Sequence, residues 1–186
     1  RRDGIIAINL REDDELIAVR RVKQGERVMM VSAEGKAIKW DEADARPMGR
    51  DTTGVRGMNV KADDRVLGME IAYPGSELFV VTERGYGKRT PVDQYPIQNR
   101  GGMGVKTIQV TPKKGRLAGM KIVMPGHELM LISEEGVIIR VKAEDISQLG
   151  RSTQGVKVMN VAESDRVSAI ARAAAICQVR SRPDWL

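Results

Sequence analysis

The chain has 186 residues, of which 41% are apolar and 30% charged, and it carries a net charge of +6. This is enough for a packed core in one domain of ordinary size or two small ones. The single cysteine, Cys177, excludes an internal disulfide framework and a Cys-x-x-Cys metal site. No apolar run is long enough for a membrane span or a signal peptide. We therefore expect a soluble, globular, cytoplasmic protein.

The sequence contains no recognisable set of catalytic residues. The single histidine, His127, follows Pro125 and Gly126 in a turn-like stretch, so we predict a structural or surface role for it. No nucleophile, acid and base occur in a recognisable motif, which leaves the chain without a catalytic constellation of its own. We expect no catalytic residue, no metal site and no cofactor within this chain.

An internal repeat of 50 to 51 residues organises the sequence. Three glycine-containing segments align at this offset, and so do three Glu/Arg-Gly turns and three Asp/Gly-Arg-Val/Leu segments. The first of these sets comprises residues 48–55, 98–105 and 149–156. Self-similarity at this period is typical of propellers and solenoids, in which each unit buries its apolar face against its neighbours.

Each repeat begins with a predicted β-hairpin. Short apolar runs at 28–31, 78–81 and 129–132 are each followed by a turn and a second run that ends in a basic residue, namely Lys39, Arg89 or Arg140. A third strand is predicted after the glycine-containing segment and a fourth after the next turn. These strands span 55–60, 105–110 and 156–161, and then 66–71, 117–123 and 167–171. Single helical turns are predicted at 41–44 and 142–146.

The predicted fold is therefore all-β, with four-stranded antiparallel blades of a propeller type. Residues 1–172 form the blade region, and 173–186 form an atypical, Ala-rich tail. The repeats within the blade region are a partial unit at 1–15 and full units at 16–65, 66–116 and 117–166. Three and a half blades are too few to close a ring, so we expect exposed sheet edges through which the chain could associate.

The excess positive charge lies in the middle repeat. Residues 82–116 hold eight basic and two acidic side chains, whereas the rest of the chain carries 23 of each. Basic residues also recur once per blade, in the turns and at the hairpin ends. Stacked blades would align them along one rim, which suits a phosphate backbone. The recurring residues are Arg50, Arg100 and Arg151 in the turns and Lys39, Arg89 and Arg140 at the hairpin ends.

Duplex DNA is the predicted ligand class. Aromatic residues make up 3% of the chain and do not recur once per repeat, so base stacking on single strands is disfavoured. No helix-turn-helix or zinc-finger pattern is present, which leaves deformation of a duplex around a curved basic surface. The glycines of 100–104 do not form a nucleotide-binding loop, because no Gly-x-x-x-x-Gly-Lys-Ser/Thr motif exists. We expect them to let the backbone approach a phosphate beside Arg100.

The motifs together resemble the C-terminal domain of the DNA gyrase A protein. The resemblance covers residues 3–172 and rests on four segments. These are 79–90 (FVVTERGYGKRT), 51–57 (DTTGVRG), 150–156 (GRSTQGV) and 98–104 (QNRGGMG).

The resemblance implies a β-pinwheel, a propeller-like disc whose blades exchange a strand and whose basic rim wraps duplex DNA with positive writhe. The parent would be an ATP-dependent type II topoisomerase that introduces negative supercoils, with ATP and Mg2+ used elsewhere in the holoenzyme. The implied partners are double-stranded DNA, the rest of the gyrase A protein and the gyrase B protein in an A2B2 heterotetramer. The implied location is the bacterial cytoplasm, on the nucleoid. None of Tyr73, Tyr86 and Tyr95 matches the DNA-cleaving tyrosine, which belongs to another domain.

The family's box motif consists of Gln, basic, Arg, Gly, Gly, basic and Gly. In this sequence Gln98, Arg100, Gly101, Gly102 and Gly104 match it. Two neutral residues, Asn99 and Met103, replace the flanking basic ones, so the segment resembles a second, degenerate copy. The predicted DNA-binding residues are Lys39, Arg50, Lys88, Arg89, Gln98, Arg100, Gly101, Gly102, Gly104, Arg140 and Arg151.

Two other interpretations remain open. The related subunit of topoisomerase IV has a smaller disc and a degraded box, and the segment 85–90 together with the box remnant favours gyrase over it. A propeller that serves as a protein-interaction scaffold could use the same rim charge to bind acidic proteins. Competition with DNA would distinguish this scaffold from a DNA-binding domain.

Overall fold

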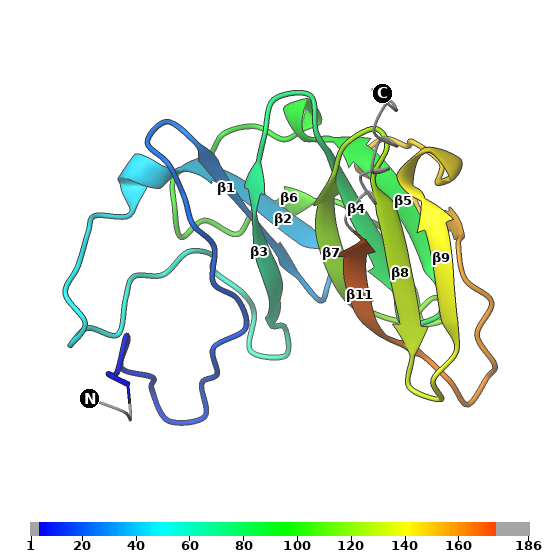
Figure 1. Cartoon of the computed structure of the whole chain (residues 1–186), viewed down its shortest axis with the longest axis horizontal. Helices are drawn as coiled ribbons and strands as arrows, with labels where there is room; N and C mark the ends of the chain where they lie inside the picture. Colours follow the sequence, from blue (N-terminus) through cyan, green and yellow to red (C-terminus); the bar gives the residue numbers. More distant parts are fainter. Residues whose placement is uncertain (1–3, 174–186) are drawn as a thin grey trace, which may run out of the picture.

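The computed structural model describes residues 4–173. Three antiparallel sheets lie side by side along the chain (Figure 1). Each is built on a hairpin, and the described residues contain no α-helix, only three short 3-10 helices. The hairpins are β1 (Arg27–Ser32) with β2 (Lys36–Asp41), β4 (Glu77–Thr82) with β5 (Tyr86–Pro91), and β8 (Glu128–Ser133) with β9 (Ile138–Lys142). The 3-10 helices are η1 (Glu42–Asp44), η2 (Val92–Gln94) and η3 (Ala143–Asp145).

The all-β prediction is confirmed, as are the three hairpins and the strands predicted after the second turn. Those strands are β3 (Val66–Ala72), β7 (Leu117–Val123) and β11 (Val167–Ala173), and each pairs with the first strand of a hairpin. The helical turns predicted near 41–44 and 142–146 are present as η1 and η3, whereas η2 was not predicted. The predicted Ala-rich tail lies, apart from Ala173, outside the described residues.

The prediction for the third strand was wrong in both length and membership. Residues 105–110 and 156–161 contribute only the two-residue strands β6 (Val105–Lys106) and β10 (Val156–Lys157), and residues 55–60 form no strand. Moreover, β6 pairs with β2 and β10 with β5, so each joins the hairpin of the preceding repeat. The sheet orders are therefore β3-β1-β2-β6, β7-β4-β5-β10 and β11-β8-β9. This arrangement is a strand exchange between successive blades.

The core lies between neighbouring sheets. Successive residues of β4 point to opposite faces: Leu78 and Val80 pack towards the first sheet, and Phe79 and Val81 towards the third. All six residues of β4 are buried, which explains why this strand reads as a continuous apolar run. In β8 the alternate residues are only half-buried, because that sheet packs on a single neighbour within the described part of the chain.

The packing also defines an inner and an outer side. Strand β7 contacts both β3 and β11, so these three strands lie on the inner side. The second hairpin strands β2, β5 and β9 lie on the other side of each sheet, and β6 and β10 add to β2 and β5 there. We call this outer side, with its exchanged strands and loops, the rim. Residues 4–26 and 46–65 run as extended loops beyond the first sheet (Figure 1).

Candidate nucleic-acid interface

Two equivalent loops, 98–104 and 149–155, cover the outer strands of the first and second blades. The Gln98 amide donates to Lys39 O (2.8 Å), and the Leu149 amide donates to Arg89 O (2.8 Å). Each loop then leads into its exchanged strand, β6 or β10. These two loops, which carry the predicted turn arginines Arg100 and Arg151, therefore lie on the rim, as predicted, and strand exchange holds them there. The third predicted turn arginine, Arg50, lies in the stretch 45–65, which contains no strand.

Three of the predicted DNA contacts instead hold the blades together. Lys88 is fully buried, and its Nζ donates to Gly150 O, Arg151 O (2.7 Å) and Thr153 Oγ1 (3.0 Å). Burial lowers the pKa of the Lys88 ammonium to about 8. All three of its N–H donors are used inside the loop, so none is available to a phosphate group in this structure.

Lys39 and Arg89 occupy equivalent places in the first two blades and are engaged in the same way. Lys39 is 6% exposed, and its Nζ donates to Val92 O (2.8 Å). Burial lowers the pKa of Lys39. The Arg89 guanidinium donates to Ile146 O (2.8 Å) and forms an ion pair with Glu77. The hairpin-end cations of these two blades therefore dock the next 3-10 segment, because buried cations require oxygen partners.

The glycines of the 98–104 loop serve backbone packing. The amide of Gly101 donates to Gly57 O (2.9 Å), so it is not free to bind an anion. Gly104 has a φ of 70°, and a Cβ there would lie 2.5 Å from Ala37 O. Gly102 accepts a hydrogen bond from the Asn59 amide (2.9 Å). The side-chain oxygen of Gln98 is buried, with no hydrogen-bond partner among residues 4–173.

The remaining predicted arginines differ in availability. Arg100 donates to Asp44 O (2.9 Å) and Arg56 O (2.6 Å), so its guanidinium fastens the loop to its neighbours. Arg140, on the third blade, pairs with Glu128 but keeps 51% of its side chain exposed. Arg50 is exposed and Arg151 half-buried, and neither side chain forms a hydrogen bond or an ion pair within the described part of the chain. Of the predicted cations, Arg50 and Arg151 are thus the ones free to meet a ligand.

A second group of cations lies on the rim near the hairpin turns, and none of its residues was in the predicted site. Lys106 on β6 lies opposite Lys36, and Lys157 on β10 lies opposite Tyr86. These side chains are exposed or half-buried, and none forms an ion pair with a described carboxylate. We call the group the lysine edge. It consists of Lys36, Lys61, Lys106, Lys113, Lys114 and Lys157.

A signal for the lysine edge was present in the sequence. Each repeat carries the pattern Gly-Val-basic, ending in Arg56, Lys106 and Lys157. The role of that basic residue depends on strand exchange, which brings Lys106 and Lys157 to the rim of the preceding blade. Without the pairing partner, the pattern alone could not place these lysines.

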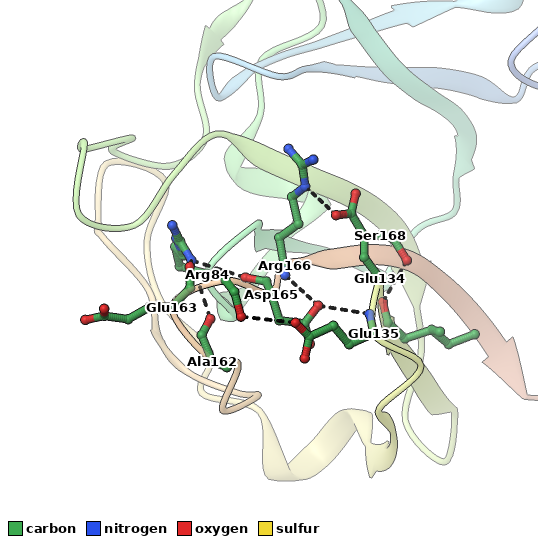
Figure 2. A network of polar contacts seen from close by, with 10 residues as sticks. Arg84, Glu134, Glu135, Ala162, Glu163, Asp165, Arg166 and Ser168 are labelled. Atoms are coloured by element: carbon green, nitrogen blue, oxygen red, sulfur yellow. Dashed lines mark hydrogen bonds and ion pairs between the residues drawn. The ribbon is translucent and has the colours of Figure 1, made fainter.

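Hydrogen bonds fix the hairpin turns beside the lysine edge. The carboxylate of Asp165 accepts from the amides of Glu135 (3.1 Å) and Arg166 (2.8 Å), as Figure 2 shows. A hydrogen bond to Ser133, together with these amides, lowers the pKa of Asp165. Asp64 accepts from the Glu34 and Arg65 amides in the same way in the first blade. The rim therefore presents its cations on constrained turns.

Arg84 belongs to this network and is not free. Its guanidinium donates to the carbonyl oxygens of Glu163 and Asp165, so it caps the turn that leads into β11 (Figure 2). Arg166 pairs with Glu134, and Arg116 pairs with Glu34. Near the hairpin turns, the arginine side chains are thus mostly engaged in hydrogen bonds and ion pairs within the protein, whereas the lysines form no ion pairs there with the described carboxylates.

Residues 4–173 contain no grouping of three or more His, Cys, Asp or Glu that could hold a metal ion. His127 closes its turn, with Nδ1 accepting from the Met124 amide (3.1 Å), as the prediction of a structural role required. Tyr95 is buried and hydrogen-bonded to Thr107. Within the same residues no helix is long and apolar enough to cross a membrane.

These features define the class of protein: a strand-exchanged, propeller-like repeat with a cationic rim. Comparison with known proteins identifies the family. The model of the DNA gyrase C-terminal domain, beta-propeller, matches residues 1–23, 26–72, 76–124 and 127–174, and the chain belongs to that family. The resemblance found in the sequence motifs is thereby confirmed.

The relatives agree with this assignment. The DNA gyrase A protein of Staphylococcus aureus strain MRSA252 is 43% identical over 173 residues, which are 92% of this chain and 20% of that protein. The chain therefore spans about a fifth of the length of the relatives it matches. A solved structure of a DNA gyrase A C-terminal domain superposes with a TM-score of 0.84 at 26% identity, covering 92% of this chain and 58% of the other.

The fold is shared more widely than the sequence. The C-terminal domain of DNA topoisomerase IV superposes with a TM-score of 0.85 at 24% identity, covering 91% of this chain and 53% of the other. At that identity the likeness concerns the fold alone. The family match and the gyrase relatives make the topoisomerase IV alternative the weaker one.

Proposed function

We propose that this chain binds duplex DNA without sequence specificity and wraps it around the rim, as part of a gyrase A protein. The observation that carries the proposal is the recurrence of free cations along the rim, with Arg151 in its loop and the lysine edge beside the hairpin turns. Arg50 adds a free cation in the extended loop beyond the first sheet. Cations spaced once per blade match a backbone of evenly spaced phosphates and offer no base-specific readout.

The wider role follows from the family. In the proposed holoenzyme the chain joins the rest of the gyrase A protein and the gyrase B protein in an A2B2 heterotetramer, in the cytoplasm and on the nucleoid. There, wrapping would present a DNA segment for passage, and ATP and Mg2+ bound elsewhere would drive negative supercoiling. A binding role within that cycle is supported by the cations that the rim leaves free of carboxylate partners.

Ligation of nicked circular plasmid in the presence of increasing amounts of protein tests wrapping directly. We expect the linking-number distribution to shift towards positive writhe as protein is added. The variant Arg50→Ala/Arg151→Ala should bind all duplex sequences more weakly and reduce the salt slope of log K by about two units, because two phosphate contacts are lost. Its shift in linking number should shrink accordingly.

Two results would count against the proposal. If the wild-type chain fails to bind duplex DNA at low salt, the rim is not a DNA surface. If acidic proteins bind the rim and duplex DNA does not displace them, the scaffold interpretation is favoured. Binding without a linking-number shift would restrict the proposal to holding DNA, with bending supplied by other blades.

A further inference from the structure

An unusual arrangement of charge surrounds Tyr86, the first residue of β5. Two ammonium groups lie over its ring, Lys114 Nζ at 4.6 Å and Lys157 Nζ at 4.7 Å from the ring centroid. Lys157 comes from the exchanged strand β10, directly opposite Tyr86 in the sheet register. Lys114 comes from the turn that precedes β7. One ring thus brings together cations from two distant segments.

Neither ammonium is neutralised by a carboxylate. Lys114 Nζ donates to Gln154 O (3.2 Å), and Lys157 Nζ donates to Arg84 O (3.1 Å). These carbonyl contacts orient the two ammonium groups but use only one N–H of each. Among the described residues no acidic side chain forms an ion pair with either lysine. Four N–H donors and two positive charges therefore remain available beside the ring.

A surface hollow of about 530 Å³ adjoins the ring. Lys113 and Pro112 line it together with Tyr86 and Lys157, and Glu163 is the one acidic residue of the lining. Figure 2 shows the Glu163 side chain extending away from the Arg84 network, in which its backbone carbonyl, not its carboxylate, accepts from Arg84. The hollow is open to solvent and lies on the rim, so a large polymer can reach it.

Two like charges that share one ring repel each other, and the ring offsets this only in part. An anion placed between the ammonium groups would turn that repulsion into attraction. The free N–H donors match the non-bridging oxygens of a phosphate group. A ring already occupied by ammonium groups is a poor platform for stacking a base, which favours a duplex backbone over a single strand.

We propose that Tyr86, Lys114 and Lys157 form a binding site for one phosphodiester group of the DNA backbone. This inference rests on the proposed function and assigns it a specific anchoring point. The site exists only when β10 is docked, because β10 supplies Lys157. It is also particular to the second blade, since Lys36 and Val137 stand where Tyr86 stands in the neighbouring blades.

Salt-dependent binding of a short duplex, followed by fluorescence anisotropy, tests the site with Lys114→Gln/Lys157→Gln. We expect a reduction of about one unit in the salt slope, because one phosphate contact is lost, and about a tenfold loss of affinity at moderate salt. The variant Tyr86→Leu keeps both lysines but removes the ring, and it should lose about two- to fivefold. Thermal unfolding of each variant checks that the blades remain folded.

The matched control is Lys23→Gln/Lys142→Gln, which removes the same charge from exposed positions at the opposite end of the hairpins. This control should keep the wild-type slope. An equal loss in both double variants would overturn the site in favour of general surface charge. A wild-type slope in Lys114→Gln/Lys157→Gln, with duplex binding intact, would overturn the site and leave the proposed function standing.

Inorganic phosphate distinguishes a backbone site from a small-anion site. We expect the lysine ε-methylene resonances of Lys114 and Lys157 to shift with duplex DNA and to stay unchanged when phosphate replaces chloride at equal ionic strength. Saturable shifts with inorganic phosphate, unaffected by duplex, would overturn the assignment to a phosphodiester. If the wild-type chain does not bind duplex DNA at low salt, the proposed function itself is wrong. The anisotropy measurement on the wild type tests this before any variant is compared.

Discussion

At the scale of single residues, the cations of this chain divide into those that hold the blades together and those that face solvent. Lys88 is the clearest of the first kind, because its ammonium is buried and donates to three oxygens of the 149–155 loop. The sequence shows only a Lys-Arg pair in a basic repeat, and such a pair is as compatible with a DNA contact as with a structural role. Only the position of the loop over β5 decides between the two roles.

The burial of Lys88 leads to a prediction about pH. Its pKa is about 8 when folded, whereas an exposed lysine in the unfolded chain keeps its ordinary value of about 10.4. Between about pH 8 and pH 10.4 the unfolded chain binds more protons at Lys88 than the folded chain does, so the free energy of unfolding rises with pH in this range. Below about pH 8 Lys88 is charged in both states, and the cost of burying the charge is fully present. Relative to Lys88→Met, we expect wild-type stability to increase by on the order of 1 kcal/mol from pH 7.5 to 9.5, since the three oxygen partners offset part of the effect.

Urea unfolding at several pH values measures this difference, and every other titrating group cancels in the comparison with Lys88→Met. A difference that stays flat from pH 7.5 to 9.5 would show that Lys88 keeps its ordinary pKa. The variant itself is expected to be less stable than the wild type at every pH, because it leaves buried loop oxygens without a donor.

At the scale of elements, a positive φ favours glycine in all three hairpin turns, and strand exchange adds a close contact at two of them. Gly35 and Gly85 adopt positive φ values of 80° and 77°, and the exchanged segment passes directly beside them. A Cβ at Gly35 would lie 2.8 Å from Ile108 O, and one at Gly85 would overlap Met159 O. Gly136, with a φ of 85°, occupies the same turn in the third blade, where no atom of residues 4–173 outside the turn lies within 4 Å of such a Cβ.

The hairpin turns therefore allow a comparison between a glycine beside an exchanged segment and one without such a neighbour. Gly136→Ala should cost about 1 kcal/mol, which is the strain of a positive φ alone. Gly85→Ala should cost at least about 2 kcal/mol more, because the new methyl group displaces the segment that carries β10. Chemical denaturation measures both values, and hydrogen exchange should show faster exchange of β5 amides in Gly85→Ala only. Equal costs at the two positions would mean that the exchanged segment does not constrain the turn.

The strands of the blades also show which features could be predicted from the sequence and which could not. The hairpins and the strands β3, β7 and β11 could be predicted, because alternation, turns and apolar runs are local signals. Periodicity could not predict the membership of β6 and β10, since a two-residue strand has none and its partner lies about 70 residues earlier. Only the family resemblance implied that the blades exchange a strand. The lysine edge was missed for the same reason, whereas the repeat did predict that the loop carrying Arg151 lies on the rim.

At the scale of the whole molecule, residues 4–173 contain one strand-acceptor edge and one strand-donor segment that do not pair with any described strand. Ile138, the first residue of β9, and the preceding Val137 are 55% and 48% exposed, and this edge of β9 has no partner strand within residues 4–173. Equivalent positions on β2 and β5 are covered by β6 and β10. The equivalent donor at 54–57 forms no strand, and Val55 is 38% exposed.

Donor and acceptor are complementary, and they lie in different blades, so two copies can pair head to tail without closing a ring. We expect the 186-residue chain to self-associate, with the weight-average sedimentation coefficient rising with concentration. Ile138→Lys places a charge on the open edge and should suppress this rise. Val19→Lys alters an apolar residue that is even more exposed but lies away from the edge, and it should not suppress the rise. A wild-type chain that sediments as a monomer at every concentration would show that two-residue pairing is too weak to act between molecules, and that strand exchange depends on the covalent connection between blades.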